Sequence, residues 1–330
     1  MFGNLLSVHD LSLLVEKIRQ GRLADIVSRI ARGKDAVDKS WSHVEYPPKN
    51  WWDIPEVMER WNQMVSGDPR KDYVAYFLER HAAARRAMRA LSLGSGTGSR
   101  EVELARSGLF ARVDGVDFSA PRIAYAARRA REAGFVGIIN YVVGDAARVD
   151  LEPGSYDVVI AEQFLHHVSP LEPMLSRIGS LLARDGFFMF NEFVGPARFQ
   201  WTDTQLKAVN ALLAELPEKY RIRWKSGTVK RRIHRPGRLA VRLFDPTEAA
   251  ESSRIVPLVR EAFEVIELKG YGGSVLQPLF NDIAFNFLSR DPETGRYIRH
   301  CFETEDALLA RGEISHDFVV GICARFDGDR

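Results

Sequence analysis

Residues 90–101 read ALSLGSGTGSRE, and the fold can be inferred outward from this stretch. A short apolar run leads into glycines at positions 94, 96 and 98, and residues 99–106 have helical character. Glycine lets the backbone turn tightly and approach a ligand closely, while a helix N-terminus presents N–H groups without partners. The spacing is G-x-G-x-G, with Ser99 where the dinucleotide-binding fingerprint has its third glycine. We therefore predict a ligand-binding loop between a strand and a helix.

Strand-like and helix-like segments alternate from this loop to residue 195. The segments with strand character are 90–94, 111–117, 138–143, 156–161 and 186–193. Helices are expected at 99–106, from an N-cap at Ser119 through Pro121 to Gly134, and at 171–182. The alternation is typical of a doubly wound α/β fold with a mostly parallel sheet, whose ligands bind beyond the C-terminal strand ends.

Two aspartates stand at the ends of the second and third strand segments. Asp117 lies 19 residues after Gly98, where a carboxylate can accept hydrogen bonds from both ribose hydroxyls. Asp145 follows the third strand, where it can accept from an exocyclic amine. Either residue alone is more typical of a turn or a cap. Together with the glycine loop, they indicate a nucleoside-containing cofactor.

Over residues 90–195 the motifs resemble those of class I S-adenosylmethionine (SAM)-dependent methyltransferases. They are LSLGSGTGSRE, VDGVDFS, VVGDAARVDL, YDVVIAEQFLHHV and LLARDGFFMFNEF, in chain order. The resemblance implies a seven-stranded Rossmann-like sheet, SAM as cofactor and S-adenosylhomocysteine as product. The residues that it assigns to the cofactor are Gly94, Ser95, Gly96, Gly98, Asp117, Phe118, Asp145, Ala146, Glu162 and Gln163.

The chain departs from this family at one position. The family usually has an acid two residues before the first glycine, and Ser92 stands there instead. That acid helps to hold the charged amino group of the cofactor. Glu101 and Glu162 are the two candidates for a replacement carboxylate.

Three residues are candidates for the catalytic base. His166 and His167 follow the fourth strand, and Glu192 closes the fifth. A histidine can accept a proton at neutral pH, and a neighbouring carboxylate can orient it and stabilise its charged form. The family resemblance favours His166 with Glu192, as in sugar and natural-product O-methyltransferases. His167 and Glu192 remain alternatives for the base.

Missing motifs disfavour other chemistries. EQFL stands after the fourth strand in place of the Asn/Asp-Pro-Pro-aromatic motif of adenine-amine methyltransferases. Neither Cys301 nor Cys323 is near that strand, which disfavours pyrimidine methylation through a thiol adduct. No cluster of oxygen ligands for Mg²⁺ and no Cys/His spacing for zinc is evident, so no metal is predicted.

Further segments flank the predicted core of 90–195. Residues 1–89 are expected to form a helical N-terminal arm, whose aromatic stretch 41–61 either packs on the core or covers a ligand as a lid. A capping box at Thr202 and Gln205 predicts a helix within a basic cap, 196–246. Residues 247–330 would complete the core, with a helix opened at Asp245-Pro246, strands at 263–271 and 317–326, and a helical insertion at 275–316.

The net charge of +2 conceals one strongly basic segment. Residues 219–242 carry ten Lys or Arg and no acid. Such runs are usually solvated surface, but this one follows the fifth strand, where a substrate cap is expected. Arg231, Arg232 and His234 are therefore candidates to bind a phosphorylated or carboxylated acceptor. Nucleic acid fits less well, because aromatic residues are sparse there and no nucleic-acid-binding module is recognisable.

The sequence thus predicts a methyltransferase that acts on a hydroxyl of a sugar-like or secondary-metabolite small molecule. Two cysteines and the lack of an uninterrupted apolar run of about 18 residues favour a cytoplasmic protein without a membrane span. The sequence does not specify the oligomeric state, and a homodimer is one alternative. The alternatives are an NAD-dependent oxidoreductase and a non-catalytic protein that binds a cofactor or RNA. The acceptor atom, O, N or C, is not specified by the sequence.

Overall fold

A computed structural model describes residues 50–237 and 247–326 of the 330-residue chain. Within them, seven strands form one sheet in the order β3-β2-β1-β4-β5-β7-β6. The strands are β1 (Met88–Leu93), β2 (Phe110–Asp117), β3 (Ile139–Val143), β4 (Tyr156–Glu162), β5 (Leu182–Phe193), β6 (Glu264–Gly270) and β7 (Phe318–Ala324). Strands β1 to β5 are mutually parallel, and β7 is antiparallel to both β5 and β6. The predicted doubly wound, mostly parallel sheet is confirmed.

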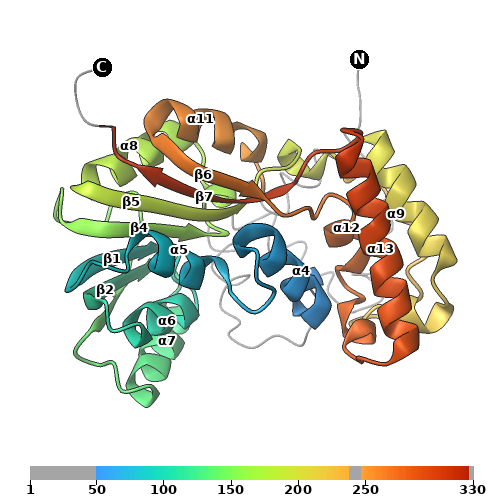
Figure 1. Cartoon of the computed structure of the whole chain (residues 1–330), viewed down its shortest axis with the longest axis horizontal. Helices are drawn as coiled ribbons and strands as arrows, with labels where there is room; N and C mark the ends of the chain where they lie inside the picture. Colours follow the sequence, from blue (N-terminus) through green and yellow to red (C-terminus); the bar gives the residue numbers. More distant parts are fainter. Residues whose placement is uncertain (1–49, 238–246, 327–330) are drawn as a thin grey trace, which may run out of the picture.

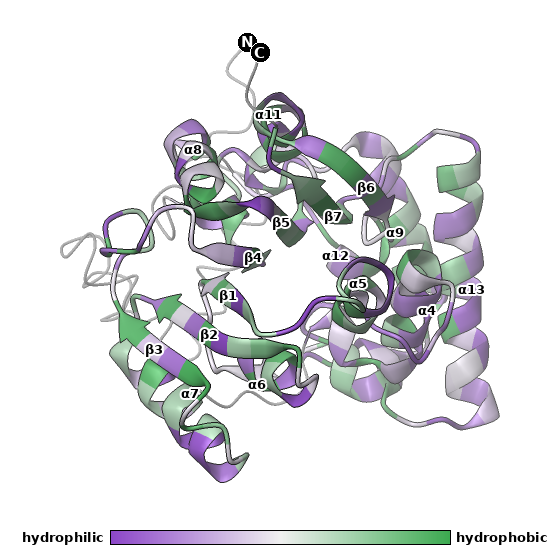
Figure 2. Cartoon of the chain, turned by 60° about the vertical axis from the view of Figure 1, so that its left-hand side comes forward, coloured by the Kyte–Doolittle hydropathy of each residue, from purple (hydrophilic) through white to green (hydrophobic). Residues whose placement is uncertain are grey.

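Helices cover both faces of this sheet (Figure 1). On one face, α6 (Ser99–Arg106) and α7 (Ala120–Glu132) pack on β2 and β3. On the other, α8 (Leu171–Leu181) and α11 (Ile255–Ala262) lie against each other. Each face has its own buried apolar cluster, so hydrophobic burial drives the assembly from both sides. Figure 2 shows the predominantly apolar strands β5 and β7 between these layers.

A second group of helices packs beside the sheet (Figure 1). Its helices are α4 (Pro55–Ser66), α5 (Tyr73–His81), α9 (Asp203–Glu215), α12 (Leu276–Phe280) and α13 (Pro292–Ala310). Helix α9 begins with the predicted capping box, since Thr202 Oγ1 accepts from Gln205 N at 3.2 Å and Gln205 Oε1 accepts from Thr202 N at 2.7 Å. The helical segments expected between residues 275 and 316 are present as α12 and α13.

Ser119 is the N-cap residue of α7, as predicted, although its side chain makes no capping hydrogen bond and its backbone N–H donates to Asp117. One detail of the predicted elements is wrong. The fifth strand begins at Leu182, not at residue 186, because Leu182 pairs with Tyr156 before a register irregularity. The predicted helices before residue 50 and the Asp245-Pro246 cap lie outside the described residues.

The aromatic stretch contributes to the core where it is described. Trp51 and Trp61 are 1% and 8% exposed, and their rings stack 6.0 Å apart. The Trp61 ring also stacks on Tyr271, just after β6, at 4.1 Å. These two tryptophans therefore dock α4 on the sheet, as the packing interpretation expects. No helix among residues 50–237 and 247–326 is long and apolar enough to cross a membrane.

Candidate functional site

The glycine loop connects β1 to α6 with a backbone that only glycine tolerates well. Gly94, Gly96 and Gly98 have φ values of 70°, 56° and 81°. A Cβ at Gly98 would lie 2.4 Å from the Tyr141 hydroxyl and 2.7 Å from the Ala126 Cβ. The N–H groups of Gly94 and Ser95 both donate to the Val116 carbonyl, at 2.9 and 3.0 Å. The loop is thereby fixed against the end of β2.

Asp117 lies at the C-terminal end of β2, directly beside this loop. Its side chain is nearly buried; Oδ2 accepts from Gly96 N at 2.9 Å and Oδ1 from Ser119 N at 2.8 Å. Each carboxylate oxygen has a second lone pair available in principle. The residue that was predicted to hold the ribose thus also positions the loop.

The next strand end supplies a surface that fits a flat heterocycle. Phe118 and Val143 are large apolar side chains that are 44% and 51% exposed. Val143 is the cross-strand neighbour of Asp117, so this apolar surface adjoins the carboxylate. Asp145 follows with a half-exposed carboxylate that accepts from Ala147 N at 2.9 Å, and Ala146 beside it is buried. Apolar contacts next to two carboxylates match an adenosine, so the residues present fit the cofactor.

Glu162 and Gln163 secure the end of β4. Arg100 Nε and Nη2 donate to the Glu162 carboxylate at 2.7 and 2.8 Å, and Arg100 Nη1 pairs with Asp72 at 2.6 Å. Gln163 has a φ of 50°, and its backbone N–H and Nε2 both donate to the Asn191 carbonyl. Glu162 is therefore already neutralised by an arginine, which weakens its candidacy as the carboxylate for the amino group of the cofactor.

Glu101 is the buried carboxylate beneath the loop. It is 0% exposed in the first turn of α6, and Tyr141 Oη donates to its Oε2 at 3.5 Å. Its Oε1 has no hydrogen-bond partner in the described part of the chain. Burial raises the pKa of Glu101 to about 7, against a hydrogen bond from Ser92 that lowers it. The acid missing at position 92 thus has a counterpart next to it, supplied by the helix.

This burial predicts a pH-dependent cost in stability. The pKa of Glu101 is 4.5 in the unfolded chain and about 7 in the folded protein. The contribution of Glu101 to the free energy of unfolding is therefore largest below pH 4.5 and is lost as the pH rises toward 7. In the wild type, this effect should lower the free energy of unfolding by about 3 kcal/mol between pH 4.5 and 8, and we expect Glu101→Gln to abolish that decrease. Urea unfolding of both proteins across this range measures it, with the exposed Glu132→Gln as control. Parallel wild-type and E101Q stability curves would refute the assignment.

His166 and Glu192 form a buried pair where β4 and β5 end. His166 lies in the 3₁₀ turn η2 (Leu165–His167), and its Nδ1 is 2.7 Å from Glu192 Oε2. Glu192 Oε1 also accepts from the backbone N–H groups of Phe164 and Leu165, both at 2.6 Å. Burial raises the pKa of Glu192 to about 8, against these N–H bonds. When Glu192 is ionised, Nδ1 donates to it and the imidazole lone pair is on Nε2.

Glu248 is a site residue that sequence reasoning missed. Its carboxylate lies 4.0 Å from His166 Nε2 and 3.6 Å from His167 Nδ1. The two imidazole rings lie 4.0 Å apart between centroids. All three predicted catalytic residues are thus neighbours, and Glu248 joins them from a distant part of the chain. Its sequence context, a Thr-Glu-Ala-Ala run, carries no signal for this role.

The basic segment is divided between structural and exposed cations. Lys219, Arg223 and Arg235 pair with Glu293, Asp282 and Asp203 at 2.6, 2.8 and 2.7 Å. Lys230 is buried, and its Nζ donates to the carbonyls of Pro278, Leu279 and Asn281. Burial lowers the pKa of Lys230 to about 7. Lys230 therefore caps α12 and does not serve an anion site.

The cations that were named as substrate ligands stand apart from these pairs. Arg231 and Arg232 are exposed, and His234 is partly buried. Burial lowers the pKa of His234, and the charge of Arg232 adds to that effect. Within residues 50–237 and 247–326, His166 contacts Glu192 and Glu248, and the role of these three side chains in substrate binding stays a prediction.

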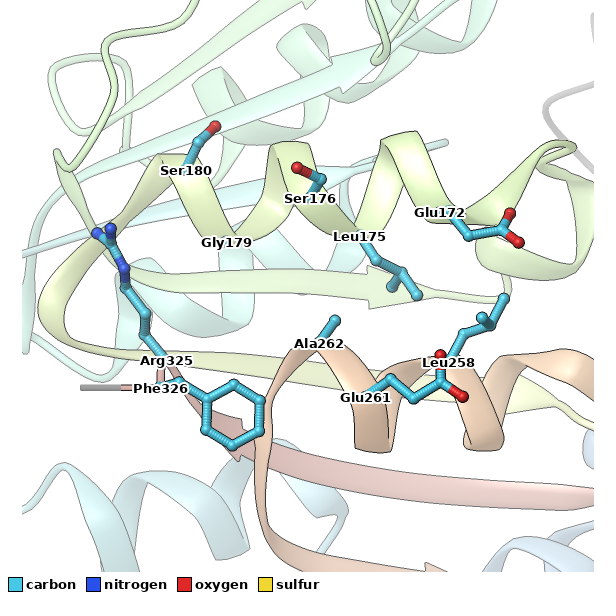
Figure 3. Close-up of a pocket in the computed structure, with 10 residues that line it drawn as sticks. All are labelled: Glu172, Leu175, Ser176, Gly179, Ser180, Leu258, Glu261, Ala262, Arg325 and Phe326. Atoms are coloured by element: carbon cyan, nitrogen blue, oxygen red, sulfur yellow. The ribbon is translucent and has the colours of Figure 1, made fainter. Parts of the chain in front are cut away.

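A separate groove lies between α8 and α11 (Figure 3). Its walls include Glu172, Leu258, Glu261 and Arg325. None of the predicted cofactor or catalytic residues lines it. It is therefore distinct from the site at the strand ends.

Comparison with known proteins gives this site a class. Residues 91–190 match the family model of a methyltransferase domain. A ubiquinone biosynthesis O-methyltransferase from Burkholderia ambifaria (strain MC40-6) is 32% identical over 103 residues, 31% of this chain and 43% of that protein. A demethylmenaquinone methyltransferase from Beutenbergia cavernae is 34% identical over 113 residues, 34% of this chain and 44% of that protein. The chain thus spans less than half the length of these curated relatives.

Among solved structures, geranyl diphosphate C-methyltransferase from Streptomyces coelicolor A3(2) aligns with 88% of this chain and 97% of its own. The two are 13% identical, with a TM-score of 0.49. The domain match, the sheet order and the glycine loop define residues 91–190 as a class I methyltransferase domain. S-adenosylmethionine is the cofactor of this class.

Proposed function

We propose that the chain transfers a methyl group from S-adenosylmethionine to a hydroxyl of a small molecule. The observation that carries this proposal is the 2.7 Å contact between His166 Nδ1 and the buried Glu192 carboxylate. It lies at the same strand-end edge of the sheet as the glycine loop, where α/β folds bind their ligands. A histidine oriented by a carboxylate is suited to remove a proton from an attacking hydroxyl.

The residues of the chain divide the work between binding and proton transfer. When bound, the cofactor supplies an electrophilic methyl group on a sulfonium. The loop and Asp117 would hold its ribose, and Phe118, Val143 and Asp145 its adenine. When Glu192 is ionised, it accepts from His166 Nδ1 and keeps the imidazole lone pair on Nε2, which accepts the hydroxyl proton. The imidazolium that results is stabilised by the Glu192 carboxylate. Positioning the acceptor in line with the methyl group supplies the remaining acceleration.

Two observations favour the acceptor class. The curated relatives are named for O-methylation in ubiquinone biosynthesis and for demethylmenaquinone methylation, which are both small-molecule reactions. The exposed Arg231 and Arg232 with His234 would suit an acceptor that carries a phosphate or carboxylate. A sugar-like or secondary-metabolite small molecule that carries such a group beside its hydroxyl agrees with both observations.

Cofactor titration and label transfer test the proposal together. We expect S-adenosylhomocysteine to bind in a calorimetric titration, and NADH not to bind. With methyl-labelled S-adenosylmethionine, we expect label on oxygen when the protein is offered a panel of catechols, hydroxylated glycosides and sugar phosphates. Mass spectrometry locates the label. Binding of NADH without binding of S-adenosylhomocysteine would overturn the proposed function, and label on carbon or nitrogen would overturn the hydroxyl acceptor.

A further inference from the structure

Three potential metal ligands converge beside the proposed base. His166 and His167 are adjacent in η2, and Glu248 approaches them from a segment about 80 residues further along the chain. One ligand atom of each, an imidazole nitrogen or a carboxylate oxygen, lies within 4.8 Å of the others. The closest separations are 3.6 Å for His167 Nδ1 to Glu248 Oε2 and 4.0 Å for His166 Nε2 to Glu248 Oε1.

The separations are close to those of a bound metal. Zinc–ligand bonds of about 2.0–2.1 Å hold tetrahedral ligand atoms about 3.3 Å apart. The separations of 3.6 and 4.0 Å, which run to different oxygens of Glu248, exceed this value by less than 1 Å, and one ligand atom from each of the three residues can be chosen so that none lies more than 4.8 Å from another. The Glu248 side chain is 26% exposed and the His167 side chain 21%. A small rotation of these two partly exposed side chains would complete the coordination, while buried His166 stays fixed.

Glu192 contacts the cluster through His166. Its Oε2 lies 2.7 Å from His166 Nδ1 and accepts a hydrogen bond from it when Glu192 is ionised, and its Oε1 accepts from the backbone N–H groups of Phe164 and Leu165. With the proton on Nδ1, the lone pair of His166 is on Nε2, which lies 4.0 Å from Glu248 Oε1. Metal-binding histidines almost always donate their other N–H to a carboxylate or carbonyl in this way, and the contact raises their basicity as ligands.

We propose that His166, His167 and Glu248 bind a divalent transition metal, Zn²⁺ above all, and that the bound metal inhibits methyl transfer. Two imidazoles and one carboxylate suit Zn²⁺, Ni²⁺ and Co²⁺, whereas Mg²⁺ and Ca²⁺ prefer oxygen ligands alone. The inhibition rests on the proposed function, because the His166 lone pair that a metal takes is the one that would accept the proton. The metal site itself does not depend on that function.

Direct binding tests the site without reference to activity. We expect the chelator-treated full chain to bind one Zn²⁺ in a calorimetric titration, and Co²⁺ to give the visible absorption of a low-symmetry site. His167→Ala and Glu248→Gln should each weaken Zn²⁺ binding at least tenfold. His300→Ala is the matched control, since His300 contacts Glu215 at 2.7 Å on the surface of α13 but has no second imidazole in the described contacts. We expect its affinity to equal that of the wild type.

Two outcomes overturn the metal site. The first is that the wild type binds Zn²⁺ no more tightly than H167A and E248Q do. The metal would then bind at some other place on the protein. The other is an equal loss in H300A, which would indicate scattered surface binding. Circular dichroism of each variant confirms that it is folded.

The inhibitory role has its own readout. We expect label transfer by the wild type to fall as Zn²⁺ is added, with a midpoint near the calorimetric Kd, and to recover on adding a chelator. Zn²⁺ binding with unchanged or increased label transfer would overturn inhibition and leave the site intact. Zn²⁺ binding by a protein that fails to bind S-adenosylhomocysteine would instead refute the proposed function, so the two failures are distinguishable.

Discussion

Replacing His166 by alanine is expected to lower methyl transfer about 10²- to 10⁴-fold while the affinity for S-adenosylmethionine stays unchanged. The loss corresponds to removal of a positioned general base. His166 lies 2.7 Å from Glu192 where β4 and β5 end, whereas the glycine loop, Asp117 and Asp145 stand at or just after the ends of β1, β2 and β3. Initial rates of label transfer and calorimetric titration of the cofactor separate the two effects.

The alanine variant leaves a buried carboxylate without its imidazole partner, so a second variant is needed. In His166→Asn the amide nitrogen takes the place of Nδ1 and can still donate to Glu192, but no base remains. We expect H166N to lose as much turnover as H166A and to melt closer to the wild-type temperature. His300→Ala, which breaks an exposed His–Glu contact, should keep full turnover. Wild-type turnover in H166N would remove His166 as the base.

The glycine loop and the strand ends that would hold the cofactor were predictable because their sequence signals are local. Positions 94, 96 and 98 have a left-handed backbone conformation that favours glycine, so the loop can be recognised from its glycines in the sequence. Asp117 and Asp145 end short apolar runs whose period identifies strands. Parallel pairing then brings those strand ends to one edge without further information. The same logic missed the start of β5, since Asp185-Gly186 reads as a turn while Leu182 already pairs with Tyr156.

The acceptor side was only partly predictable because it is assembled by tertiary packing. Glu248 meets His166 and His167 across about 80 residues, and no periodicity or spacing connects them. Lys230 belongs to a basic run that reads as solvated surface. It is buried because three carbonyls from residues 278–281 surround its ammonium group. Contacts of this kind depend on how segments far apart in the sequence pack together, and local sequence propensity does not determine that packing.

The departure at Ser92 shows how the two kinds of information combine. The sequence showed that an acid was missing and left Glu101 and Glu162 as replacements. The structure distinguishes them by their partners, because Glu162 is paired with Arg100 while Glu101 Oε1 has no partner in the described residues. A buried carboxylate without a cation is costly, and a cationic cofactor on the loop above it would offset that cost. We therefore expect Glu101 of α6 to supply the carboxylate that is missing at position 92 of β1.

Asp117→Ala is expected to weaken binding of S-adenosylmethionine at least about 100-fold, which corresponds to about 2.7 kcal/mol. Two effects add. The carboxylate would lose its hydrogen bonds to the ribose hydroxyls, each worth about 1.5–3 kcal/mol for a charged acceptor. The loop would also lose the contact from Gly96 N to Asp117 Oδ2 at 2.9 Å, which holds it in its binding conformation.

Matched aspartates separate these effects from a general loss of structure. Asp157 also accepts a backbone N–H, from Arg89 at 2.8 Å, but it stands near the opposite, N-terminal end of β4. We expect Asp157→Asn to bind the cofactor like the wild type. Asp145→Asn should lose less than D117A, because its carboxylate is half-exposed and already accepts from Ala147 N. Calorimetric titrations, with thermal melting of each apo variant, measure both. If D117A binds as tightly as the wild type, the ribose does not lie at β2, and the cofactor must be placed elsewhere along the strand ends.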